Sequence, residues 1–567
     1  MAETLIFSKE NKIPNNKKKL FIGQWLLLNK KKKIKDYKVL KYEETTESKI
    51  KEYEYIKKVY GNVLKNLTPI LNKIHKKQYK ENDWEILIFY SLVYFISTAY
   101  SKWKLIKKSK TKYNLLPIEI FSFKKNYFLK DDSQSFFTQM KTDEYDDWLF
   151  SKIIKAQNFK FHEKKISKNK KKYKDFDNIK KLKLQRLLFP KNNNKYFLIN
   201  LALPKFLKLK LNLLLNKNLR VYNNIDFKKG VDISSKRNLF LSIKTKNKFE
   251  KFIYETLSEI FPRNFLENFE FIEKNISYLN WPKKPKVIFT SYEHYFNDVF
   301  KIYTINKKQD GAKFHILQHG HQGLNNMCLN YYEQKICNSY FNWGNLTKGN
   351  YKSLFCPTIV AKTITKNIKK DILLSYSEFT LKPWKFMPLP KQIDETNIYR
   401  DDIIKLLHWL NKDSTNDITL KYNTVNENQY TTNEIKKNFK KLNFIQTDLK
   451  KRGFEFSREY KLNIETTNST GFLELLALNI PVILVTNKKF FDVKKEYKKI
   501  FEDLIKCNVI FFDPKKAADF IKLNINNISH WWLDELTQRR IKKFCNHVCK
   551  YEGSLNHGLS SLINQIK

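Results

Sequence analysis

The chain has 567 residues, more than the roughly 250 to 300 at which a single hydrophobic core stops growing, so at least two domains are expected. Its composition, 42% apolar and 15% aromatic, excludes a chain that stays disordered. The net charge of +51 would attract polyanions, phosphorylated substrates and anionic lipid surfaces. No specific nucleic-acid partner is expected, because the lysines are spread over many runs and accompany no known nucleic-acid-binding motif.

Three features favour a cytoplasmic location. The six cysteines are too dispersed for a disulfide framework, and the first residues, MAETLIFSKENK, lack the apolar core of a signal peptide. The most apolar run, Ile86 to Tyr100, is shorter than the roughly 20 residues that cross a bilayer, so it predicts a buried helix. Contact with the inner membrane would then be peripheral.

The first half begins with an apolar run at Leu20 to Leu28, which is typical of a first strand. Apolar spacings of three and four then predict two long helices, at about 47–75 and 84–107. The Lys- and Asn-rich stretch at about 110–282 has no assignable architecture and is interpreted as an insertion or a lid. A strand at Pro285 to Ser291, a helix from Tyr295 and a strand leading into Gly320 then predict a βαβ unit.

A second α/β series is expected after a domain boundary near residue 365. It starts with a strand at Asp371 to Ser377, and helices alternate with further strands at about 417–421, 461–464, 482–485 and 508–512. Such alternation predicts parallel sheets covered by helices. The fold class is therefore α/β, with two Rossmann-like domains at 1–365 and 366–567 and a ligand-binding cleft between them.

The segment Asn463 to Val485, NIETTNSTGFLELLALNIPVILV, reads as strand, polar turn, helix and strand. Hydroxyl and amide side chains gather where the helix begins, and they are Thr466, Thr467, Asn468, Ser469 and Thr470. A helix start of this kind can bind phosphate through its dipole and free amides. Glu474, one turn further, could accept hydrogen bonds from sugar hydroxyls, although an ordinary helix cap would look the same.

The segment Phe314 to Gly323, FHILQHGHQG, is a buried strand that runs into a turn. His319 at the end of that strand suits a general base or a phosphate contact, with Gln318 and Gly320 beside it. Neither this segment, with His315 and His321, nor the cysteines around His547 form a plausible metal site, so no metal and no cofactor are expected. Trp531 and Trp532 are interpreted as core residues of a C-terminal helix.

These segments, together with LFIGQW at Leu20 to Trp25, DWEILIFYSL at Asp83 to Leu92 and SHWW at Ser529 to Trp532, resemble a family of transferases from bacterial O-antigen and surface-polysaccharide biosynthesis regions. The QHG turn and the STGFLE helix also resemble GT-B glycosyltransferases. The resemblance implies a donor-binding C-terminal domain and an acceptor-binding N-terminal domain. His321 and Glu465 depart from the family pattern, as does Lys421 where relatives carry an Arg.

The resemblance implies residue roles as well. His319 and Glu474 would be catalytic, and the donor and phosphate contacts would be Gln318, Gly320, Lys421, Thr466, Thr467, Ser469 and Thr470. The predicted activity is sugar transfer from a nucleotide-sugar donor to a glycan or lipid-linked acceptor, without a metal. Two alternatives stay open, a nucleotide-sugar epimerase or polyol-phosphate transferase, and a non-catalytic protein that binds polyanions or membrane surfaces.

Overall fold

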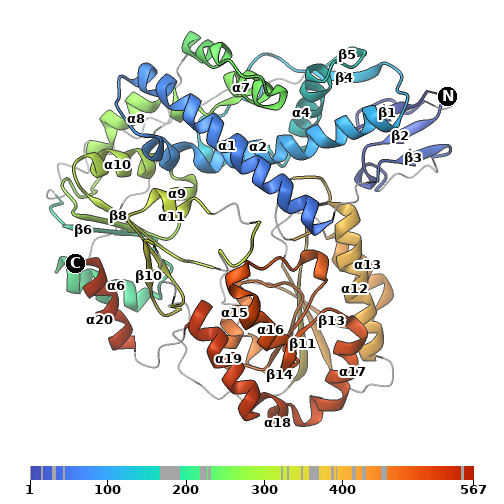
Figure 1. Ribbon diagram of the computed structural model, residues 1–567, viewed down its shortest axis with the longest axis vertical. Coiled ribbons are helices and arrows are strands. Elements are labelled where there is room, and N and C mark those ends of the chain that lie inside the picture. Colours follow the sequence, from blue (N-terminus) through green and yellow to red (C-terminus); the bar gives the residue numbers. More distant parts are fainter. Residues whose placement is uncertain are drawn as a thin grey trace. The chain divides into compact units, whose positions relative to one another are not determined.

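The computed structural model describes residues 2–14, 17–28, 34–41, 45–166, 192–217, 222, 227, 232–320, 323–327, 331–345, 349–356, 370–384, 389–390, 392–411, 417–423, 429–447, 456–550 and 555–567 (Figure 1). Its contacts divide the chain into two compact units. The first unit comprises Met1–Asn200, Asn218–Phe314 and Pro383–Phe386, and the second comprises Leu201–Lys217, His315–Lys382 and Met387–Lys567. The boundary predicted near residue 365 lies outside the described residues.

Two long helices dominate the first unit, as the apolar spacing predicts. They are α1 (Thr46–His75) and α2 (Glu81–Lys112), which pack against each other. The run from Ile86 to Phe89 is fully buried in α2, together with most of the apolar residues that follow, so this segment is a core helix as expected. No helix among the described residues is long and apolar enough to span a bilayer.

The strand predicted at Leu20 to Leu28 is wrong over most of its length. Only β2 (Lys19–Phe21) is extended, paired in parallel with β1 (Thr4–Ile6) and β3 (Tyr37–Val39), and a 3-10 helix follows at Gln24–Leu26. The reason lies at Gly23, where a Cβ atom would fall 1.7 Å from the ring of Trp25. The chain turns here so that Trp25 folds back over the glycine.

Regular elements also fill the stretch at 110–282 that the sequence leaves unassigned. Those in the first unit are β4 (Ile118–Ser122), α3 (Ser133–Gln139), α4 (Asp143–Ala156), β5 (Phe161–Lys165), β6 (Tyr196–Ile199), α7 (Lys248–Ile260) and α8 (Phe269–Asn275). Strands β4 and β5 pair in parallel, and α4 packs on β4. The stretch is thus an α/β part of the fold in its described portion.

In a further, five-stranded sheet the strands lie side by side in their sequence order, as β10-β9-β8-β7-β6. Its remaining strands are β7 (Val287–Thr290), β8 (Lys313–Leu317), β9 (Ser339–Asn342) and β10 (Tyr351–Ser353). The helices between β7 and β8 are α9 (Glu293–Phe296) and α10 (Asp298–Gln309). The predicted βαβ unit is therefore confirmed, and every apolar position of β8 is buried.

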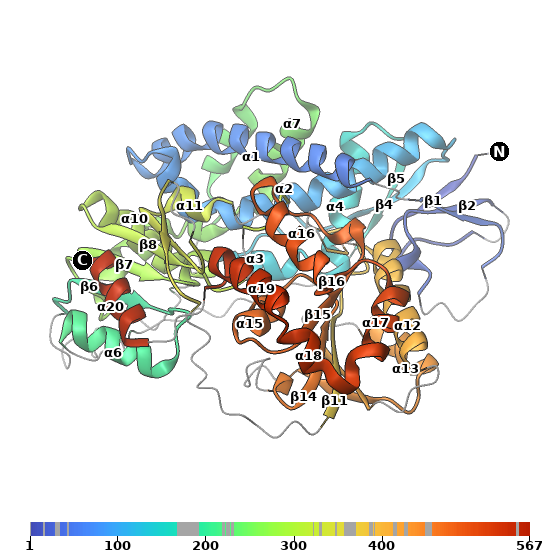
Figure 2. The same ribbon diagram turned by 60° about the horizontal axis from the view of Figure 1, so that its bottom comes forward.

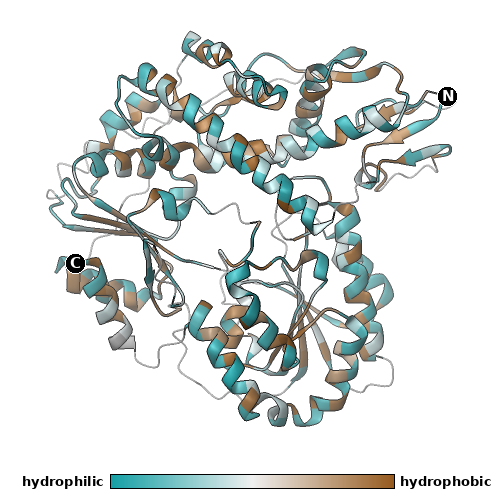
Figure 3. Cartoon of the chain, viewed as in Figure 1, coloured by the Kyte–Doolittle hydropathy of each residue, from teal (hydrophilic) through white to brown (hydrophobic). Residues whose placement is uncertain are grey.

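The second unit contains a six-stranded sheet in which every pair is parallel. In spatial order the strands are β13 (Asn443–Gln446), β12 (Ile418–Asn423), β11 (Lys370–Ser377), β14 (Tyr460–Glu465), β15 (Val482–Val485) and β16 (Ile510–Phe511). The central strands are apolar between more polar helices (Figure 3). Two parallel sheets with helical crossovers confirm the α/β class.

Helices cover both faces of this sheet (Figures 1 and 2). On one face α12 (Ile393–Asn411) packs against α13 (Tyr430–Asn438) and α17 (Pro514–Asn524). On the other face α15 (Thr470–Ala477) and α16 (Lys498–Lys506) pack against α19 (Glu535–Val548). Trp531 and Trp532 of α18 (Ile528–Trp532) are buried, and their indole N–H groups donate to Cys507 and Asn479 carbonyls, so the predicted core role is confirmed.

Candidate functional site

The strand order of the second unit locates a site for a ligand. If its strands are renumbered from β11 as 1, their order is 3-2-1-4-5-6. The chain therefore adds strands outward from β11 on one side and outward from β14 on the other, and the direction changes between these two neighbours. In open α/β sheets, ligands bind beside the carboxyl ends of the strands at such a switch point. Here both the amide and the hydroxyl of Thr466, just after β14, donate to the carbonyl of Ser375 in β11, at 3.2 and 2.9 Å.

A chain of hydrogen bonds ties the switch point to α12. The Ser377 amide donates to the Tyr399 hydroxyl at 3.1 Å, and that hydroxyl lies 2.6 Å from Thr466 Oγ1. Because the Thr466 hydroxyl donates its only proton to the Ser375 carbonyl, the Tyr399 hydroxyl must be the donor to Thr466 Oγ1. Burial raises the pKa of Tyr399, which keeps the phenol protonated. The Thr466 hydroxyl therefore fixes the two strand ends, and its hydrogen-bonding capacity is spent within the protein.

A row of polar residues crosses three strands at the same edge. Ser375 in β11 pairs in register with Lys421 in β12 on one side and with Glu465 in β14 on the other. Burial raises the pKa of the Glu465 carboxyl, while the charge of Lys421 and then the Ser375 hydroxyl act against that rise. The lysine side chain is half-buried and supplies positive charge beside the sheet edge.

Helices that start at this edge differ in how their first amides are satisfied. Buried Glu378, after β11, accepts the amides of Thr431 and Thr432 in α13 at 3.0 and 2.7 Å. Asp513 caps α17 in the same way. In α15, by contrast, the N-cap residue Ser469 has an extended backbone and its side chain makes no capping hydrogen bond. This helix end can therefore offer its dipole to an anion.

Asn468, just before α15, supports the same interpretation. Both polar atoms of its side-chain amide are buried, and neither has a hydrogen-bond partner among the described residues. A buried amide without a partner costs free energy, so native proteins rarely keep one unless a ligand or a water completes it. An amide can donate to phosphate oxygens and accept from hydroxyls. Thr467 beside it is buried as well.

The turn after β8 meets the start of α15. A Cβ atom added at Gly320 would lie 2.9 Å from Thr470 Oγ1, so only glycine allows this approach without a shift. Gln318 holds the turn, because its Nε2 donates to the Gly320 carbonyl at 2.8 Å and its Oε1 accepts the Trp343 amide at 2.8 Å. His319, between Gln318 and Gly320 in the sequence, is half-buried. Two segments about 150 residues apart in the sequence thus converge.

Glu474 lies one turn into α15 on its half-buried side. Its negative charge contributes to the raised pKa values of Glu465 and of Cys549, after the larger effect of burial. The carboxylate is therefore close to the same strand edge, within the second unit. The start of α15 lies close to Glu465, since a Cβ atom at Gly471 would make ordinary van der Waals contact with Glu465 Oε1, at 3.5 Å.

Five of the predicted site residues thus separate into two groups. Gln318 and Thr466 spend their polar atoms on internal hydrogen bonds, whereas Gly320, Ser469 and Thr470 lie at the meeting of the turn and the helix. His321 lies outside the described residues, and His315 is buried with its ring against Phe341. The described residues include no group of three His, Cys, Asp or Glu side chains that could hold a metal.

Sequence reasoning missed two residues of this site and gave a third no separate role. Tyr399 lies in α12, twelve residues before its end, and nothing local marks its partner Thr466. Glu378 sits in a polar stretch after β11, far in sequence from the amides it accepts. Asn468 was considered only as one member of the polar cluster, and its unpaired amide becomes visible only in three dimensions.

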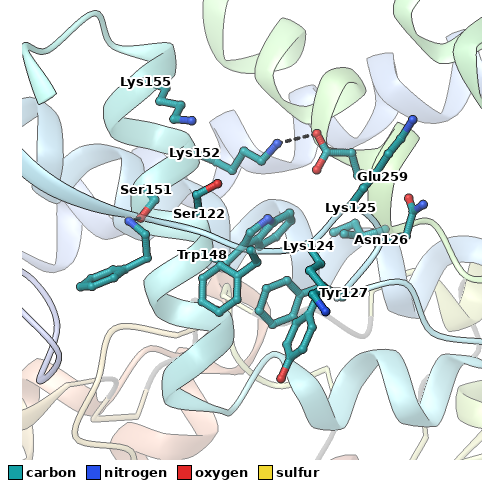
Figure 4. A pocket seen from close by; sticks show the side chains of 14 residues that line it. Ser122, Lys124, Lys125, Asn126, Tyr127, Trp148, Ser151, Lys152, Lys155 and Glu259 are labelled. Carbon is teal, nitrogen blue, oxygen red and sulfur yellow. Dashed lines mark hydrogen bonds and ion pairs between the residues drawn. The ribbon is translucent and has the colours of Figure 1, made fainter. Parts of the chain in front are cut away.

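Two hollows lie among the described residues, one beside this site and one away from it. One, of about 300 Å³ including space open to solvent, lies beside Thr466 and Tyr399 at the ends of β14 and β15. The other, of about 520 Å³, lies in the first unit between β4, α4 and α7 (Figure 4). Its lysines Lys152 and Lys155 are already paired with Glu259 and Glu163, at 2.5 and 2.6 Å. It contains none of the predicted residues.

A comparison with family models matches residues 4–562 to one described as LIC12162 family transferase. A search of curated proteins finds no match. Similar solved structures include S. aureus MnaA with UDP, at 10% identity and a TM-score of 0.34 over 55% of this chain and 84% of that one. They also include a S. aureus TarM mutant with fondaparinux, α-GlcNAc-glycerol and UDP, at 13% identity and a TM-score of 0.32 over 50% and 55%. MurG from Acinetobacter baumannii matches at 9% identity and a TM-score of 0.29 over 50% and 74%.

Proposed function

Because the chain belongs to the LIC12162 family of transferases, we propose that it transfers a sugar from a nucleotide-activated donor to a surface-polysaccharide or lipid-linked acceptor. The observation that carries the proposal is the meeting of the β8 turn with the uncapped start of α15 at the topological switch point. A donor diphosphate fits this place because a helix N-terminus, hydroxyls and an unpaired amide are all suited to phosphate oxygens.

In this proposal the second unit binds the donor. The first amides of α15 and the Asn468 side chain hold the diphosphate, and they stabilise the negative charge that develops as it leaves. Lys421 adds positive charge from β12, and Glu474 accepts hydrogen bonds from ribose or sugar hydroxyls. Thr466 and Gln318 are positioning residues, since they fix the strand ends and the turn.

His319 is the proposed general base. It lies two residues after β8, between Gln318, which fixes the turn, and Gly320, whose Cβ position is 2.9 Å from Thr470 Oγ1. A neutral imidazole there would accept the proton of the acceptor hydroxyl as that oxygen attacks the anomeric carbon. The sugar–phosphate bond breaks in the same step, and the nucleotide leaves with its electron pair.

The proposal is tested by nucleotide release from nucleotide sugars with uridine, cytidine, guanosine or thymidine bases, with and without glycan acceptors. We expect release from one donor class that depends on an acceptor. His319→Ala should lower kcat by about a hundredfold or more with little change in donor affinity, as expected for loss of a general base. His408→Ala, at an exposed position of α12, is the matched control and should leave both unchanged.

Other outcomes would replace this function. Conversion of the nucleotide sugar to its epimer without any acceptor would identify an epimerase. Transfer of a polyol phosphate would identify a polyol-phosphate transferase. Full activity of His319→Ala would remove that residue from the mechanism. No turnover with any donor, together with salt-sensitive binding of polyanions that is indifferent to His319 and Glu474, would indicate a binding protein.

A further inference from the structure

Helix α6 (Lys205–Asn216) exposes more large apolar surface than any other described helix. Its exposed residues are Phe206 at 50%, Leu209 at 50%, Leu213 at 48% and Leu214 at 52%. Only twelve large apolar side chains are 40% or more exposed among the described residues, and a third of them lie within three turns of this one helix. Phe206, Leu209 and Leu213 have spacings of three and four, which puts them on one face.

The opposite face of α6 anchors the helix in the second unit. Leu207 and Leu211 are buried, at 2% and 0% exposure, and α6 packs against α20 (Leu555–Ile566) (Figure 2). The helix is thus apolar on two sides, although only one of them is buried. A contiguous apolar patch of this kind marks an interaction surface, since isolated exposed side chains would be scattered.

The charge of the helix identifies the partner. Lys205, Lys208 and Lys210 lie in α6 and Lys217 caps its end, while the helix contains no Asp or Glu. A helix that combines an apolar stripe with lysines lies in the headgroup region of an anionic bilayer, with the lysine stems extended toward the lipid phosphates. Twelve residues span only about 18 Å, too short to cross the hydrocarbon core.

We propose that α6 is a membrane-surface anchor that inserts Phe206, Leu209 and Leu213 into an anionic lipid leaflet. The proposal gives a surface to the peripheral membrane contact expected from the sequence, and it does not depend on the donor site. A second copy of the chain fits this face less well. In a two-fold dimer the same lysines would face each other, and the whole chain already carries a net charge of +51.

The test is flotation with vesicles of pure phosphatidylcholine and of phosphatidylcholine with about a third phosphatidylglycerol, a charge content that attracts lysine-rich segments. We expect binding to the anionic vesicles only. The triple variant Phe206→Ser, Leu209→Ser, Leu213→Ser should lose at least about tenfold in vesicle affinity, because it removes the inserted apolar area. Lys205→Gln with Lys210→Gln should weaken binding and reduce its dependence on salt.

The matched control is the triple variant Leu523→Ser, Leu533→Ser, Leu536→Ser, whose side chains are 85%, 63% and 52% exposed on other elements. It should bind vesicles like the wild type. Absence of vesicle binding by the wild type, or equal binding by the α6 variant, overturns the proposal. A dimer in light scattering that dissociates only in the α6 variant, without vesicle binding, would assign this face to a second copy. Nucleotide affinity, measured in parallel, should be the same in all variants.

Discussion

Gly320 is the residue at which the turn after β8 and the start of α15 come closest. A methyl group there would lie 2.9 Å from Thr470 Oγ1, which is too close without a shift. Gly320→Ala should therefore destabilise the second unit by about 1 to 3 kcal/mol, the usual cost of overpacking. In a Thr470→Ala background the obstructing oxygen is gone, so the same substitution should be almost neutral.

Thermal melting of the two single variants and the double variant measures this coupling. Equal costs of Gly320→Ala in both backgrounds would contradict the close approach of the two segments. Gly61→Ala is the control, because nothing lies within 4 Å of its Cβ position in α1 and alanine favours helices.

Asp147 in α4 makes the stability of the first unit depend on pH. Burial raises the pKa of its carboxyl to about 7, while a hydrogen bond from Ser8 acts against that rise. In the unfolded chain the carboxyl ionises near its ordinary pKa of about 4. The folded state therefore binds more protons between these values, so the contribution of this carboxyl to stability is greatest below pH 4 and falls as the pH rises from 4 to about 7.

Asp147→Asn removes this titration. Relative to the wild type, the variant should gain stability steadily between pH 4 and pH 8 in thermal melts at constant ionic strength. Parallel pH profiles of the two proteins would show that Asp147 is ionised in the folded state and that the argument is wrong.

At the scale of elements, Tyr399 joins α12 to the ends of β11 and β14. Tyr399→Phe leaves the ring in place but removes the acceptor for the Ser377 amide and the donor for Thr466 Oγ1. Because these groups are buried, the variant should lose about 1 to 3 kcal/mol of stability. Differential scanning calorimetry measures the loss, with Tyr37→Phe, at a 46% exposed side chain of β3, as the control. Equal melting temperatures for wild type and Tyr399→Phe would show that the hydrogen-bond chain does not hold these elements.

The elements of the second unit could mostly be predicted, because its central strands are short apolar runs between amphipathic helices. β11, β14 and β15 begin and end within one residue of their expected limits. β13 was missed, since the edge strand NFIQ is polar and only half-buried. In the first unit β5, FHEKK, is exposed and lysine-rich, so its sequence carries no strand periodicity.

The site was predictable only as separate segments. Local patterns marked His319 at a strand end and the polar start of α15, because each depends on neighbours in sequence. Their convergence depends on the strand order of two different sheets, and no local pattern encodes it. The same holds for Glu378, which lies about fifty residues before the α13 amides that it accepts, whereas the N-cap side chain of α15 makes no capping hydrogen bond.

At the scale of the whole molecule, we propose separate tasks for separate parts of the chain. In our proposals the six-stranded sheet holds the donor site at its switch point, and the apolar, lysine-rich surface of α6 binds the membrane. The net charge of +51 belongs to the whole chain, whereas the proposed donor site is one place in the second unit. Nucleotide binding should therefore be sensitive to single residues, in contrast to attraction by charge alone.

The most direct test of the donor site is calorimetric titration of the wild type, Asn468→Ala and Lys152→Ala with the nucleoside diphosphate that the wild type prefers. Asn468→Ala should melt no lower than the wild type, because its amide has no partner to lose, yet bind the nucleotide about tenfold or more weakly. Lys152→Ala, in the pocket of the first unit, should bind it normally. Unchanged affinity in Asn468→Ala, or an equal loss in Lys152→Ala, would contradict a donor site at the start of α15.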